Sequence, residues 1–200
     1  RGAAEGRGGG GRGRGGPPSA SLAAGLNQVT WGLTYPGATT FPGMVLWGAS
    51  TNGPAAVPGK YLVRLTVDGH VQTQPLTVRR HPLRSATDAD LKEQFDLALR
   101  IRDKVSEANN AVIQIRSLKQ QIEDRTAKAS TLKAEGDGLA AKVDAGEEEI
   151  YQTKNQSGQD PLNFPIKINN RIASLNRVVN AGDGKPIGAA YDIFKDVTAE

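Results

Sequence analysis

The sequence predicts an α+β protein in two parts, a small antiparallel β domain followed by an up-and-down helical bundle with one long helix. Two observations support this fold class. Most of the Gly and Pro and both Trp lie in the first eighty residues. The remaining residues are rich in Ala, Leu, Ile, Lys and Glu, with apolar positions three and four apart. Segregated strands and helices are typical of an α+β chain.

Residues 1–25 are predicted to be a disordered linker. They consist mainly of Gly and Arg and then of Pro17, Pro18 and small residues, which cannot bury enough apolar surface to offset the entropy of ordering. The first sixteen residues hold four Arg and one Glu, and so carry most of the formal net charge of +4. The folded part is nearly neutral, so it lacks a basic face that would capture nucleic acid.

Residues 26–80 are predicted to form a β domain. Alternating or apolar stretches at residues 27–35, 44–47, 60–67 and 70–78 predict four strands. Asp68 and Gly69 predict a two-residue hairpin turn, and Pro75 places the last strand at a sheet edge or bulge. An immunoglobulin-like sandwich needs about seven strands, so the predicted strands form either a tiny domain or a partial immunoglobulin-like one whose first strands precede this segment.

Residues 81–86 are predicted to be a connector, and residues 87–200 a helical bundle. Thr87 and Asp90 resemble a capping box, and the three-four spacing continues without Gly or Pro to Gly136. The sequence therefore predicts a helix of about forty residues, followed by a break at residues 136–138 or nearer Ser130. Three further helices are predicted around residues 139–151, 166–179 and 187–200. The last is expected to continue beyond Glu200, so the bundle is interpreted as truncated.

No motif in the sequence indicates catalysis. The match of residues 11–16 to a dinucleotide fingerprint lacks the strand and helix that such a site requires. His70 and His81 have no ligand-spaced partners, and the Glu147 to Glu149 run is expected to be a solvated helical face. The chain has no Cys and no apolar run of the roughly 18 residues a membrane helix needs. We therefore expect no enzyme activity, no cofactor and no metal site, and no membrane span.

Two binding functions remain as alternatives. Trp31, Tyr35 and Trp47 could stack on a glycan, which would make the β domain a carbohydrate-binding module, although a small β domain also needs such residues for its core. The Arg-Gly tract could bind RNA through stacking and phosphate contacts, but it lacks interleaved Phe or Tyr. Nucleic acid is therefore the less favoured partner.

The chain resembles the C-terminal region of large bacterial β-propeller proteins of the sortilin-like type, which carry neuraminidase repeats and a "glycosyl hydrolase" label. The resemblance rests on GLNQVTWGLTYPGATTFPGMVLWG, GPAAVPGKYLVRLTVDG, QTQPLTVRRHPL, TDADLKEQFDLALRIRDKVSEANNAVIQIR and IYQTKNQSGQDPLNFPIKINNRIASL. The stretch around residues 58–61 looks like the late strand pair of a flagellar hook-capping-type immunoglobulin-like domain.

The resemblance implies an exported parent with an extracellular or periplasmic location. It implies no catalytic residue here, because the propeller repeats lie outside this segment. The expected function is a non-catalytic structural or interaction region. Its expected partners are the parent's own propeller domain upstream and, through the helical bundle, another protein or a second copy.

Overall fold

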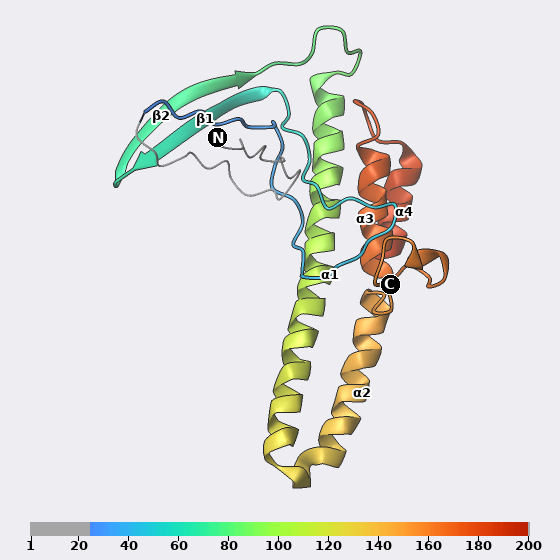
Figure 1. The fold of residues 1–200 in the computed structure, drawn as a ribbon. Coiled ribbons are helices and arrows are strands. Elements are labelled where there is room, and N and C mark those ends of the chain that lie inside the picture. The colour runs from blue at the N-terminus through green and yellow to red at the C-terminus, as the bar shows by residue number, and fades with distance from the viewer. Residues whose placement is uncertain (1–24, 200) are drawn as a thin grey trace, which may run out of the picture.

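The structure, a computed structural model, describes residues 25–199. Figure 1 shows a long helix, α1, that runs the full height of the helical part, with a two-stranded hairpin projecting from its N-terminal end. Helix α2 lies along the C-terminal half of α1, whereas α3 and α4 lie along its N-terminal half (Figure 1). The predicted α+β class is confirmed at this level.

The hairpin consists of β1 (Gly59–Val67) and β2 (His70–Val78), which pair antiparallel from Gly59 opposite Val78 to Val67 opposite His70. Asp68 and Gly69 have φ values of 46° and 81°. Positive φ at both central residues is the requirement of a type I′ turn, so the predicted hairpin and its turn are confirmed.

The two strands predicted at residues 27–35 and 44–47 are wrong. Residues 27–47 contain no strand and only one isolated bridge, from Thr34 to Ala55. Leu33, Gly43 and Gly48 have positive φ, which interrupts an extended run. Backbone groups of Thr39, Val45 and Trp47 bond instead to side chains of the helical part. Among the described residues the sheet has two strands, so an immunoglobulin-like sandwich is not formed there.

Helix α1 (Asp88–Lys128) begins where the sequence predicts. Thr87 caps it: its hydroxyl accepts a hydrogen bond from Asp90 N, and the Asp90 carboxylate accepts one from Thr87 N at 2.9 Å. This reciprocal pair is the predicted capping box with Asp in place of Glu. Asp90 accepts hydrogen bonds from Thr87, and these lower the pKa of its carboxyl group.

The break after α1 lies at Ala129 and a short 3₁₀ turn, η1 (Ser130–Leu132), so the predicted alternative near Ser130 is confirmed. The predicted break at residues 136–138 is wrong, because these residues belong to α2 (Lys133–Ile150). A Cβ on Gly136 would lie 2.2 Å from Cγ2 of Thr126 on α1. Gly136 therefore lets the two helices approach each other closely.

After α2 the chain forms a short turn, η2 (Asp160–Leu162), then α3 (Ile168–Val179) and α4 (Gly188–Ala199). The helices do not form a bundle of four side-by-side members, because α2 and α3 follow one another along α1 (Figure 1). Together they cover the long stripe of α1 that one short helix could not cover.

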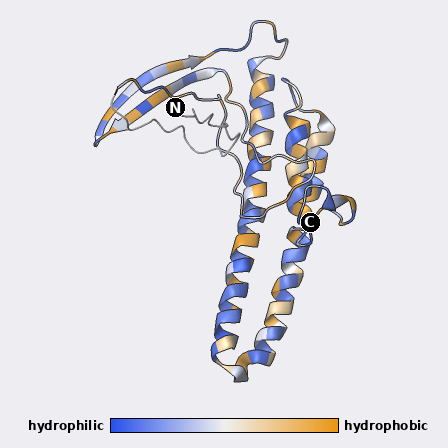
Figure 2. Cartoon of the chain, viewed as in Figure 1, coloured by the Kyte–Doolittle hydropathy of each residue, from blue (hydrophilic) through white to orange (hydrophobic). Residues whose placement is uncertain are grey.

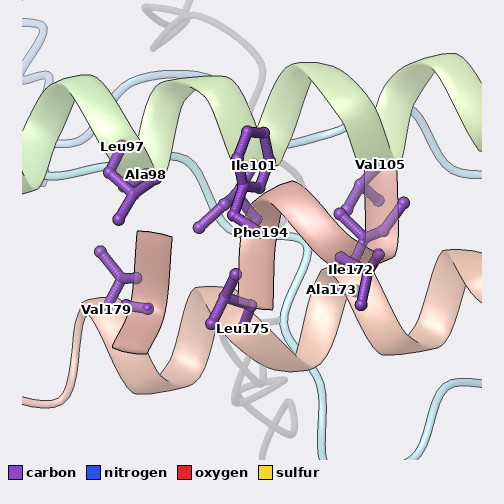
Figure 3. Close-up of a cluster of buried hydrophobic side chains, with 11 residues drawn as sticks. Leu97, Ala98, Ile101, Val105, Ile172, Ala173, Leu175, Val179 and Phe194 are labelled. Carbon is purple, nitrogen blue, oxygen red and sulfur yellow. The ribbon is translucent and has the colours of Figure 1, made fainter. Parts of the chain in front are cut away.

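The main core lies between α1, α3 and α4 (Figure 3). Its α1 residues include Leu97 and Ile101, whereas Leu118, further along the same helix, is 41% exposed. The buried members of this cluster are Leu97, Ala98, Ile101, Val105, Ile172, Ala173, Leu175, Val179, Ala190, Phe194 and Val197.

Candidate interaction surfaces

Residues 35–54, here called the strap, form a closed loop that lies across the helices. Its ends are joined by hydrogen bonds from Tyr35 N to Pro54 O at 2.9 Å and from Ala38 N to Thr51 O at 2.7 Å. A Cβ on Gly53 would lie 2.0 Å from Tyr35 O, so the two ends meet only because residue 53 has no side chain. The strap is thereby fixed at its base, close to the hairpin.

Polar side chains of α1 and α3 bind the strap backbone. Thr39 N donates to Ser106 Oγ at 3.1 Å, and Asn109 Nδ2 donates to Thr39 O at 2.7 Å. On α3, Asn170 bonds both backbone groups of Trp47, and Asn176 Nδ2 donates to Asn52 O at 3.0 Å. These side chains replace a neighbouring strand, because buried backbone groups must find partners.

The middle of the strap packs against α1 and the C-terminal end of α2 in a second cluster, outside the main core. The Phe41 ring packs edge-to-face on Tyr151 at 5.0 Å, and the Arg116 guanidinium lies over the Phe41 ring at 4.6 Å. Arg116 Nε donates to Glu147 Oε1 at 2.7 Å. The Tyr151 hydroxyl accepts from Val45 N at 3.0 Å, so α1, α2 and the strap meet in one cluster.

Glu147 corrects the prediction of a solvated acidic run. Its side chain is buried and bonded by Arg116 and Lys119, whereas Glu148 and Glu149 are exposed as expected. The pKa of Lys119 is raised, chiefly by its hydrogen bond to Asp144 and then by Glu147, against the opposing effect of burial. The run alone could not reveal this, because consecutive Glu residues give no signal of which one faces a partner helix.

The three predicted stacking residues lie in different surroundings. Trp31 packs edge-to-face on Tyr61 of β1 at 5.7 Å, and Tyr35 packs edge-to-face on Phe95 of α1 at 4.9 Å. Tyr61 and Tyr35 are also neighbours. The pKa of the Tyr61 phenol is raised, chiefly by burial and then by the charge and the hydrogen bond of Tyr35. Trp31 and Tyr35 thus belong to one aromatic cluster at the hairpin base.

Trp47 stands apart from that cluster, on the strap against α3. Its backbone is held by Asn170, and its side chain is 46% exposed. The structure therefore brings Trp31 and Tyr35 together through Tyr61 but places Trp47 elsewhere.

The hairpin has two unlike faces, and Figure 2 shows hydrophobic bands on both of its strands. Residues opposite one another share a face, so the register defines each face. Face A carries no Lys, Arg, Asp or Glu. From β1 it has Tyr61, Val63, Leu65 and Val67, and from β2 it has His70, Gln72, Gln74 and Leu76. Face B carries the two cations Lys60 and Arg64, and its other members are Leu62, Thr66, Val71, Thr73, Pro75 and Thr77. Face B thus also has exposed hydrophobic residues, Leu62 and Val71, but it alone has fixed charges.

Face A is exposed although it has the pattern of a buried face. The side chains of Val63, Leu65 and Val67 are each 53% exposed. Antiparallel sheets normally pack one face against other structure, and an isolated two-stranded hairpin is marginally stable in water. Face A is the strongest candidate interaction surface among the described residues.

A hollow of about 340 Å³ lies where the hairpin, the connector and α1 meet. Its walls include Val57, Val78 and Phe95, and its rim includes His81 and Arg84. Two of the cations that line it are engaged: Arg84 pairs with Asp183, and Arg80 donates to Ala86 O at 2.5 Å. The hollow therefore has apolar walls but few polar groups free to orient a ligand.

Within residues 25–199 no three His, Cys, Asp or Glu side chains gather as they would around a metal ion. Over the same residues no helix is long and apolar enough to cross a membrane. The Arg-Gly tract predicted as a linker or an RNA contact lies outside the described residues. Comparisons with protein-family models, curated proteins and solved structures find no match.

Proposed function

We propose that this chain is a non-catalytic structural and interaction region of a larger exported protein. In this proposal the β1–β2 hairpin is the late strand pair of an immunoglobulin-like domain, and the helical part is the base that holds it. The parent's upstream domain, a β-propeller by the resemblance given above, is the partner that this region caps or spaces.

The exposed apolar face A carries the proposal. A face with four apolar side chains on β1 and no fixed charge has the composition of a buried sheet face, while face B has the Lys and Arg of a solvent face. Covering Val63, Leu65 and Val67 would contribute roughly 25 cal/mol for each Å² of apolar surface removed from water.

The base is built to hold the hairpin in one place. Trp31 and Tyr35 pack against β1 and α1 at the hairpin base, and the strap joins that base to the helices through asparagine side chains. A rigid base favours a spacer function, because it fixes the direction of the hairpin relative to α1.

Hydrogen exchange measured by mass spectrometry on this chain and on its longer parent tests the proposal. We expect the hairpin amides to exchange quickly in this chain and slowly in the parent, with equal protection of α1 and α3 in both. Equal exchange of the hairpin in the two proteins would reject the proposal. Turnover of glycoside or sialoside substrates by this chain, lost on substitution of one of its carboxylates, would also reject it.

Carbohydrate binding is the second candidate, because Trp47 presents an exposed indole on a backbone that Asn170 holds from both sides. An exposed ring on a backbone that is held in place is suited to stacking on a sugar. Affinity-gel retardation of the protein in soluble polysaccharides tests this candidate. Retardation that Trp47→Ala abolishes and Trp31→Phe preserves would support it over the spacer function.

A further inference from the structure

The two edges of the hairpin differ in their capacity to accept another strand. Val67 and His70 flank the two-residue turn as a hydrogen-bonded pair, and hydrogen-bonded and non-hydrogen-bonded pairs alternate along an antiparallel ladder. Leu62 and Pro75 are the sixth pair from the turn. They are therefore a non-hydrogen-bonded pair, and their backbone polar groups point outward to the edges.

The β2 edge is blocked by Pro75. Proline has no N–H, and here the missing donor lies on the outward side, where a neighbouring strand would need it. Proline on an outer edge is one of the ways in which proteins prevent strand pairing.

The β1 edge carries a complete row of donors and acceptors. The outward groups belong to Lys60, Leu62, Arg64 and Thr66, and each of these residues has an N–H. Within residues 25–199 no other backbone segment bonds to them. All four residues are exposed.

We propose that the β1 edge is a strand-addition site for an extended segment that alternates apolar and acidic residues. This inference rests on the proposed function and names the partner chemistry of the same hairpin. Apolar side chains of the added strand would extend face A beside Val63 and Leu65. Acidic side chains would lie on face B beside Lys60 and Arg64, since opposite charges on neighbouring strands attract.

Charge distinguishes this partner from two others. Residues 1–16 carry four Arg and one Glu, so they would place like charges beside Lys60 and Arg64. The β1 strand of a second copy brings the same two cations to the same face. An acidic and apolar strand has neither conflict.

A nine-residue synthetic peptide, matched to the length of β1, is the probe. It alternates Val with Glu and Thr, and a second peptide has Lys in place of Glu. We expect the full chain to bind the acidic peptide in a fluorescence anisotropy titration. The basic peptide should bind at least about tenfold more weakly, and added salt should reduce the difference.

Two matched variants test the edge. Leu62→Pro removes an outward donor from β1, and Thr73→Pro removes one from β2, and neither position donates within the ladder. We expect Leu62→Pro to lose peptide binding and Thr73→Pro to retain it. Hydrogen exchange of the unmodified chain, read at single residues, is the second test. The peptide should protect the amides of Lys60, Leu62, Arg64 and Thr66 but not that of Thr73. This measurement needs no proline variant, so it holds even if such a variant unfolds.

Absence of binding below about 1 mM peptide, or protection along β2, would overturn the proposal. Protection of the β1 edge that rises with protein concentration alone would assign the edge to a second copy and would also overturn it. Hydrogen exchange in the longer parent separates this proposal from the proposed function. If the parent protects the β2 amides but not the outward β1 amides, strand addition is rejected while the proposed function stands.

Discussion

Asn170 on α3 bonds the backbone of Trp47 with both ends of its side-chain amide. Trp47 N donates to Asn170 Oδ1 at 2.7 Å, and Asn170 Nδ2 donates to Trp47 O at 2.9 Å. The amide thus offers the strap the two bonds that a neighbouring strand would offer, and it joins residues more than a hundred positions apart in the chain.

Replacing Asn170 with Leu should lower the free energy of unfolding by about 1–3 kcal/mol, because two partly buried backbone groups of Trp47 lose their partners. Urea denaturation measures this loss. In a Trp31→Phe background, Trp47 emission should also shift to the red as the strap loosens. Asn110→Leu, an exposed site on α1, is the control. Equal midpoints for the two variants would contradict the role of Asn170.

Glu147→Gln should destabilise the α1–α2 pair by about 1.5–3 kcal/mol, since its buried carboxylate accepts from Arg116 at 2.7 Å and from Lys119 at 3.1 Å. Glu148→Gln, from the exposed part of the same run, should change stability by less than about 0.5 kcal/mol. Thermal unfolding of both variants measures the difference. A larger effect at Glu148 would show that the network is not what fixes the helices.

Val112→Asp should cost several kcal/mol, because residue 112 is fully enclosed beside Phe41 and Tyr151 and an unpaired charge there has no water. Its neighbour Ile113 is 38% exposed, so Ile113→Asp should cost far less. Urea midpoints separate the two. If both variants have the same urea midpoint as the unsubstituted protein, the assignment of the α1 faces is wrong.

Two glycines of α2 should respond differently to alanine. Gly138 has open space around it, so Gly138→Ala should stabilise the helix by roughly 0.5–1 kcal/mol. Gly136→Ala gains the same helix propensity but meets Thr126, so its net effect should be smaller or destabilising. Adding Thr126→Ser to Gly136→Ala should restore the gain. Calorimetric melting temperatures provide the comparison, and an equal gain at both glycines would argue against a close helix approach.

The turn before α3 should depend on the ionised form of Asp160. The carboxylate accepts from Gln156 N at 2.6 Å and from Ser157 N at 2.7 Å, and these bonds, the first the larger, lower the pKa of Asp160 below 3.8. A lowered folded-state pKa means that the stabilisation is complete above pH 3.8 and is lost as the pH falls through the lower value.

An NMR pH titration measures the midpoint of the Asp160 carboxyl group directly. The Gln156 and Ser157 amide shifts should follow the same midpoint, because both amides donate to that carboxylate. Asp160→Asn should remove the pH dependence of both amides. A midpoint at or above 3.8 would contradict the prediction.

The sequence by itself determined the features that depend on neighbouring residues. Asp68 and Gly69 specify the hairpin turn through their positive φ, and Thr87 and Asp90 specify where α1 begins through reciprocal capping. The length of α1 followed from an uninterrupted three-four pattern. Each of these signals comes from residues close together in the chain, so it can be recognised without knowledge of the fold.

The tertiary structure decided the rest, because it depends on residues far apart in the chain. Trp47 belongs to the strap and not to a strand because Asn170 bonds its backbone, and Glu147 is buried because Arg116 and Lys119 face it from another helix. Gly136 reads as a helix breaker in sequence, yet it permits a close contact with Thr126. The hairpin turn fixes which backbone groups of β1 point outward, but only the fold shows that no other strand among the described residues pairs with them.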